Sequence, residues 1–230
     1  MSKSVSPRFK FVHFSQSQKF RFRSSHGNKL WEVGKWCTES NISICKRGFH
    51  CSKQVMQAYG YVSSDVLAVV NVKGKHIAHA DKECWSSMQI ANAYKWTDKL
   101  KRDLICCYIE ELEKDIIKDG RFGMFCMATK AALYFLKTGK RDLIKKYYTD
   151  LNSIKNDIND SAYCTKYKYY GYIENILDII TCIAISDTRN RIVDQLDIIT
   201  THTDVSDALV EAVNKRFIAK LKNHKPLPTK

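Results

Sequence analysis

The residue types with the greatest chemical potential are concentrated between residues 37 and 52. Cys37, Cys45, His50 and Cys51 are all of types that bind zinc. Seven and then five residues separate successive cysteines, which is not the spacing of a compact zinc knuckle, and adjacent His50 and Cys51 would point to opposite faces of a strand. We therefore expect no metal site, with Cys45 and Cys51 packed as small apolar side chains and His50 hydrogen-bonded nearby.

His50 is also the first candidate for a catalytic residue, because the most distinctive motif of the chain is centred on it. With Cys51 or Ser52 it suggests nucleophilic catalysis. That chemistry also needs an orienting carboxylate and an oxyanion site, and the sequence supplies no such constellation. We expect a buried structural histidine and a protein that is not an enzyme.

A second group of candidates is cationic. The segment KFRFR at residues 19–23 alternates in type, so one face of a strand there would carry Lys19, Arg21 and Arg23. Lys46 and Arg47, in a predicted turn, could extend this basic face. Such a face can lie along a phosphate backbone while neighbouring aromatic rings stack on bases. The alternative is a strand that packs its phenylalanines inward and leaves its cations solvated.

The charge distribution supports an anionic partner. The chain has 230 residues and a net charge of +14. Residues 1–60 carry 11 Lys and Arg against two Glu, and residues 215–230 carry six basic residues and no acid. Basic ends of this kind favour nucleic acid or an acidic protein as partner, although a solubilising surface gives the same pattern.

The elements that must position these residues change in character near residue 97. Before it, period-two alternation and β-branched runs predict strands; after it, a period of about 3.6 predicts helices. Ser52 is expected to cap a helix over 53–61, and Gly74 to end the best strand. The predicted strands cover 8–14, 19–23, 65–73 and 87–96, with shorter strands or extended segments at 30–36 and 49–51. The predicted later helices cover 98–118, 122–136, 141–155, 162–185, 189–200 and 205–222.

We therefore expect an α+β fold: a small β-rich N-terminal module over 1–97, packed with an all-α C-terminal helical bundle over 98–230 that ends in a basic tail. No apolar run approaches the roughly 20 residues of a membrane span, and the opening residues do not resemble a signal peptide. The expected location is the cytoplasm.

Five ordered motifs resemble a phage and prophage family of unknown function. They are WEVGKW at 31–36, CKRGFHCS at 45–52, AYGY at 58–61, VVNVKG at 69–74 and ADK at 80–82. The resemblance implies a phage-type accessory protein acting in the host cytoplasm. A virion or assembly protein, in which the helices mediate oligomerisation, is a further possibility.

The pattern GFHCSKQVMQAYGY followed by VLAVVNV also resembles the ADP-ribosyltransferase fold. That resemblance implies an enzyme that uses NAD in a cleft around residues 48–52. His50 stands where that fold usually has tyrosine, and no catalytic glutamate is convincingly placed. The preferred function is non-enzymatic binding of an anionic partner through the basic N-terminal face, with no cofactor; the NAD-dependent enzyme, active or degenerate, is the alternative.

Overall fold

The computed structural model describes residues 7–15, 21–79, 81–117, 123–140, 142 and 207–228. Its contacts divide the chain into two compact units, Met1–Leu100 with Ile218–Lys230, and Lys101–Phe217. The described elements are β1 (Arg8–Phe14), β2 (Phe22–Arg23), β3 (Leu30–Trp31), β4 (Trp36–Thr38), β5 (Phe49–Cys51), α1 (Val55–Tyr61), β6 (Val66–Ala78), β7 (Glu83–Lys95), α2 (Asp98–Ile117), α3 (Gly123–Thr138) and α8 (Asp207–Leu221).

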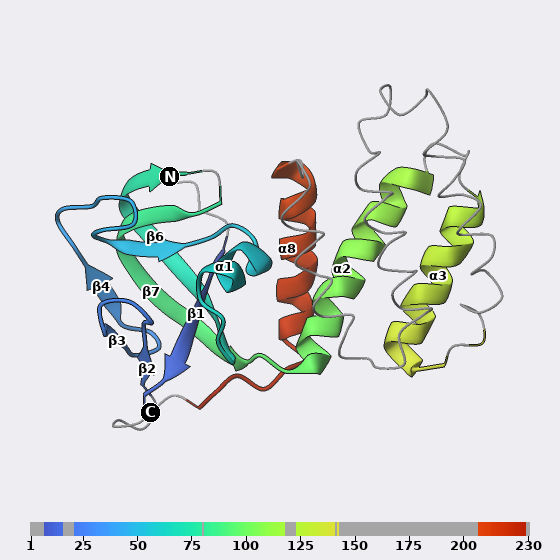
Figure 1. Ribbon diagram of the computed structural model, residues 1–230, viewed down its shortest axis with the longest axis horizontal. Helices are drawn as coiled ribbons and strands as arrows, with labels where there is room; N and C mark the ends of the chain where they lie inside the picture. Colours follow the sequence, from blue (N-terminus) through green and yellow to red (C-terminus); the bar gives the residue numbers. More distant parts are fainter. Residues whose placement is uncertain are drawn as a thin grey trace. The chain divides into compact units, whose positions relative to one another are not determined.

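The first unit is a curled antiparallel β half-barrel. The described strands form one sheet in the order β3-β2-β1-β6-β7-β4, and β5 also pairs with β7. Strands β4 and β5 share one edge of β7 end to end, because β4 pairs with residues 87–89 and β5 with residues 83–85. The long β6–β7 hairpin lies at the centre of the sheet, where β6 pairs with β1 and β7 pairs with β4 and β5 (Figure 1).

The curl brings β1 and β5 together, although they lie on opposite sides of the β6–β7 hairpin. Phe9 and Ser52 exchange two backbone hydrogen bonds, each 3.0 Å long. Ser52 is therefore part of a strand pairing, and its predicted role as a helix cap is wrong. Helix α1 begins at Val55, and its N-cap residue Gln54 makes no side-chain capping bond.

Strand β1 has buried side chains on both of its faces between Phe9 and Val12. Phe9 and Phe11 lie on the face toward α1, where the Phe11 ring contacts those of Tyr59 and Trp96 at 5.1 and 5.3 Å between centroids. The opposite face carries Val12, which belongs to an apolar cluster with residues from β2, β3, β5, β6 and β7. Because strands from both ends of the sheet contribute to this cluster, it lies on the concave face.

Two register shifts help the sheet to curl, since a bulge bends a strand and increases its twist. One lies between Lys73 and His76, around Gly74, whose φ is +87°. The Ser86 Oγ accepts a hydrogen bond from the Lys75 backbone at 2.8 Å and occupies the space that a Cβ of residue 74 would need. Gly74 was expected to end the strand, but β6 continues through the bulge to Ala78.

The fold class predicted from the sequence is wrong. The structure is a half-barrel with four described helices, and the described residues of the C-terminal half do not form a clear all-α bundle. Part of the predicted bundle instead belongs to the sheet unit: the Leu227 backbone donates to the Ala93 carbonyl at 2.8 Å, and its side chain packs against the concave cluster. A helical apolar stripe shows which face is buried but does not identify what covers it.

The second unit is described only in part. Ion pairs join its helices: Lys137 of α3 binds Glu110 of α2 at 3.1 Å, and Arg216 of α8 binds both Glu110, at 2.8 Å, and Glu111. The predicted helices 98–118, 122–136 and 205–222 are confirmed with shifted ends. Those predicted over 141–155, 162–185 and 189–200 fall almost wholly outside the described residues, and the domain boundary at residue 97 stays a prediction. Among the described helices, none combines the length and apolar character needed to cross a bilayer.

The Gly74→Ala variant should lose about 1–3 kcal/mol of unfolding free energy. Alanine disfavours the left-handed φ at this position, and its Cβ would clash with the Ser86 hydroxyl. Urea unfolding followed by circular dichroism measures this. The matched control is Gly60→Ala in α1, where a Cβ meets nothing within 4 Å. That change should be neutral or slightly stabilising, and equal losses in the two variants would contradict the role of the bulge.

Candidate functional site

The outer edge of β1 is paired at both ends and open between them. Phe9 is bonded to Ser52, while His13 and Phe14 pair with β2. At the open stretch lies a cavity of about 450 Å³, which we call the Lys10 cavity. Its walls come from β1, the β2–β3 loop, the segment 45–52 around β5, α1, and Lys82.

The described residues that line the Lys10 cavity include six basic side chains and neither Asp nor Glu. They also include aromatic side chains, of which Tyr61 is 41% exposed. The cavity is therefore electropositive, with apolar surface beside the charges. The basic residues are Lys10, His26, Lys29, Lys46, His50 and Lys82.

Lys10 is the innermost cation by its place in the sheet. In the antiparallel register it lies opposite Ala68, on the same face of β1 as Val12, and both Ala68 and Val12 belong to the concave apolar cluster. Its ammonium donates to the His50 carbonyl at 3.1 Å and lies 5.9 Å from the Trp31 ring centroid. Among the described residues it has no carboxylate partner.

Arg8, two residues earlier on the same face, has a different environment. Its guanidinium binds the Glu83 carboxylate at 2.7 and 3.2 Å, and Trp85 Nε1 donates to the same carboxylate at 2.9 Å. Burial alone would raise the pKa of Glu83, but these hydrogen bonds hold that pKa below its usual range. The Arg8–Glu83 pair thus has the partners that a structural buried charge requires, whereas Lys10 lacks a carboxylate.

The surroundings shift the pKa values of two cavity lysines in opposite directions. Burial lowers the pKa of Lys10. A hydrogen bond with Cys45 raises the pKa of Lys82, and Tyr61 adds to that effect. The cavity therefore has a stabilised ammonium, that of Lys82, at its rim. On its inner face it has a second ammonium, that of Lys10, which loses its proton more readily.

His50, the first candidate for catalysis, lines the Lys10 cavity. Its Nε2 accepts the backbone N–H of Cys45 at 2.9 Å, which places the proton of the neutral ring on Nδ1. Burial, followed by the charges of Lys10 and Lys82, lowers its pKa and favours this neutral form. The hydrogen-bonded histidine expected from the sequence is present, and it lies in the wall of the cavity.

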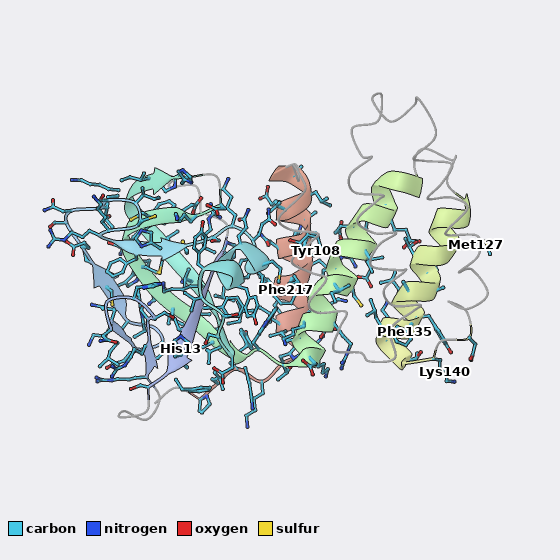
Figure 2. The ribbon with its side chains drawn as sticks, in the orientation of Figure 1. His13, Tyr108, Met127, Phe135, Lys140 and Phe217 are labelled. Atoms are coloured by element: carbon cyan, nitrogen blue, oxygen red, sulfur yellow. The ribbon has the colours of Figure 1, made fainter. Side chains whose placement is uncertain are left out.

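The rim of the cavity is organised around Tyr61. Its hydroxyl donates to the Asp81 carboxylate, and burial together with this bond raises the Tyr61 pKa. The Lys82 ammonium lies 4.4 Å from the centroid of the same ring. Outside the lining residues, His13 on β1 (labelled in Figure 2) is hydrogen-bonded at 2.7 Å to Ser25, a residue of the β2–β3 loop that lines the cavity.

The structure places the five cations of the predicted basic face in different environments. Lys46 lines the cavity, whereas Lys19 lies outside the described residues. Arg21 is paired with Glu32, and Arg47 with Glu39 at 3.6 Å. Arg23 contacts the Asn28 side chain at 3.5 Å. Two of the five predicted cations are thus already partnered by carboxylates.

The cysteines around His50 lie in different environments. Cys51 is in the concave cluster, where burial and the charge of Glu83 raise its pKa to about 12, so it is a thiol near neutral pH. Cys45 is exposed at a backbone φ of +61°. Within the described part of the chain, no group of three His, Cys, Asp or Glu residues could hold a metal ion.

Three cavity lysines were not predicted from the sequence: Lys10, Lys29 and Lys82. For Lys10 a signal was available, since a cation in FKFV shares its face with Val12 in an alternating strand. Lys29 and Lys82 lie in loops far apart in the chain, and only the curl of the sheet brings them to one cavity.

Residues 17–102 match the family model of a domain of unknown function (DUF7666). The chain is thus similar to that domain over the stretch that includes most of the half-barrel. This match does not address phage origin or the ADP-ribosyltransferase likeness. Comparisons with curated proteins and with solved structures give no match.

The Lys10→Met variant should be more stable than the wild type near neutral pH, with a melting temperature about 2–4 °C higher, because a poorly compensated cation leaves the apolar face. The lowered pKa of Lys10 means that the unfolded chain binds more protons, so wild-type stability rises with pH up to the ordinary value of 10.5. The advantage of the variant should therefore shrink as pH rises to that value. Differential scanning calorimetry across this range measures both effects.

A lower melting temperature for Lys10→Met at neutral pH would show that the ammonium is a structural group. The control is Lys95→Met on β7, an exposed lysine outside the cavity. Its melting temperature should follow that of the wild type at every pH.

Proposed function

We propose that the half-barrel binds a small phosphate-bearing ligand of the nucleotide class in the Lys10 cavity. The observation that carries this proposal is the imbalance of charge in the cavity wall: four lysines with no carboxylate among the described lining residues. Cations that are not neutralised within the protein favour an anionic ligand, and phosphate accepts hydrogen bonds from several donors at once.

The size and lining of the cavity support the same class of ligand. Pockets for small molecules commonly have volumes of about 300–1,000 Å³, and the Lys10 cavity has about 450 Å³. Trp31, Phe49 and Tyr61 line it together with the lysines. A nucleotide combines a planar base, which packs on aromatic surfaces, with phosphates, which bind cations.

The proposal keeps the predicted anionic partner but moves its site from the strand face to the cavity. Arg21 and Arg47 are paired with Glu32 and Glu39, so they offer less free charge than Lys29 and Lys46. A concave site also favours a small ligand over the flat surface of an acidic protein. A single-stranded nucleic acid that inserts one nucleotide is an outcome that the test distinguishes. A phage-type accessory role in the host cytoplasm stays a prediction.

NAD, the ligand implied by the ADP-ribosyltransferase resemblance, is a phosphate-bearing dinucleotide. Residues 48–52, where that resemblance places the cleft, line the Lys10 cavity. No described carboxylate lines the cavity with them, so the geometry favours binding over transfer of ADP-ribose. NAD is therefore one of the probes for the proposed function.

Isothermal titration with ADP, NAD, inorganic phosphate and a short single-stranded oligonucleotide tests the proposal. ADP should bind, and Lys29→Glu and Lys46→Glu should each weaken binding about tenfold, because each reversal removes a cation and adds a repulsive charge. Rising salt should weaken binding, since exposed charges are screened. The matched control, Lys95→Glu, makes the same change outside the cavity and should leave the affinity unchanged.

Equal loss of affinity in all three variants would mean that only overall charge matters and would overturn the cavity as the site. Tighter binding of the oligonucleotide than of ADP, with a steeper dependence on salt, would assign the cavity to nucleic acid instead. No binding of any probe would refute the proposed function.

A further inference from the structure

We infer that Lys10 is the reactive amine of a covalent binding site, which captures a phosphate-bearing aldehyde as an imine. This inference rests on the proposed function, because the same cavity supplies the groups that hold the phosphate. It adds a reaction and a narrower class of ligand to that function.

The position of Lys10 suits this role. Its side chain belongs to the concave face, opposite Ala68, and lines a cavity large enough for a small ligand. The ammonium has one hydrogen bond to a described protein atom, the His50 carbonyl, and no described carboxylate holds it. Arg8 on the same face is held by Glu83, so the strand places one cation in a structural pair and leaves the other available to a ligand.

Imine formation requires an unprotonated amine, and burial favours that form by lowering the pKa of Lys10. Lys29 and Lys46 are exposed and Lys82 is stabilised as a cation, so they are suited to bind phosphate. The pKa values of Lys10 and Lys82 are shifted in opposite directions in the same cavity. Lys10 can therefore react as the free amine while Lys82 stays charged.

The step balances without a redox partner. The Lys10 Nζ lone pair attacks the aldehyde carbon, and one of the two protons on the neutral amine passes to the former carbonyl oxygen, giving a carbinolamine. The nitrogen then loses its remaining hydrogen, the C–O bond breaks, a C=N bond forms, and the oxygen leaves as water. The departing hydroxyl takes a proton from solvent water as the nitrogen returns one to it, so no net proton is consumed, while the Lys82 ammonium stays charged.

Pyridoxal 5′-phosphate is a suitable probe because it carries both an aldehyde and a phosphate. The full-length protein is incubated with it and reduced with borohydride, which converts an imine into a stable secondary amine, and the modified lysine is located by peptide mass mapping. Lys10 should be labelled at least tenfold faster than Lys29, Lys46 or Lys82. Its labelling should persist at a lower pH than that of exposed lysines, and ADP should protect it.

Lys10→Arg should abolish the rapid labelling while keeping the positive charge, whereas Lys95→Arg should label like the wild type. Mapping on the wild-type protein decides the assignment even if Lys10→Arg does not fold. Labelling spread over the lysines in proportion to their exposure would overturn the inference.

Two further outcomes separate this inference from the proposed function. If ADP binds but Lys10 is not selectively labelled, the covalent step is refuted and the proposed function stands. If pyridoxal without its phosphate labels Lys10 as fast as pyridoxal 5′-phosphate does, and ADP neither binds nor protects, both the phosphate class and the proposed function are refuted.

Discussion

The candidate site depends on one pair of backbone hydrogen bonds, those between Phe9 and Ser52. They connect the first described strand to a strand on the far side of the β6–β7 hairpin and so fix the curl of the sheet. They also set the limits of the unpaired edge of β1, because the next pairing on that edge begins at His13. The residues between are the part of β1 that borders the cavity. Both the opening of the cavity and the placement of Lys10 beside the His50 carbonyl follow from this closure.

On the concave face of β1, one cation is compensated by a described carboxylate and the other is not, which lowers the stability of the fold at that point. A charge in an apolar environment is unfavourable unless it has partners, and Arg8 has them in Glu83. Lys10 lies among the same apolar neighbours without an equivalent carboxylate in the described structure. Buried polar groups without full compensation are concentrated at functional sites because the gain there lies in binding or chemistry rather than in stability. This contrast, between two cations two residues apart, supports the proposed ligand site.

Local patterns in the sequence predicted much of the secondary structure, but not the arrangement. The alternation in residues 8–14 and the β-branched run at 65–73 predicted β1 and most of β6, since both depend on neighbours in the chain. The sequence predicts a strand end at Gly74 where the structure has a bulge, because glycine is common at both kinds of position. Ser52 resembled a helix cap, and only its long-range pairing with Phe9 assigns it to the sheet. The cavity could not be predicted for the same reason: Lys29 and Lys82 are brought together by pairings that no local pattern encodes.

The docking of Leu227 onto the sheet means that the second unit is an insertion within the first. During synthesis, residues 1–100 leave the ribosome well before the segment 218–230 that completes their unit. At typical elongation rates of roughly 5–20 residues per second, the delay is on the order of ten seconds. During this delay Leu227 is not yet present to cover the Ala93 carbonyl and its part of the apolar cluster. Until the segment 218–230 has been synthesised, the half-barrel lacks the backbone hydrogen bond and the apolar contact that Leu227 supplies.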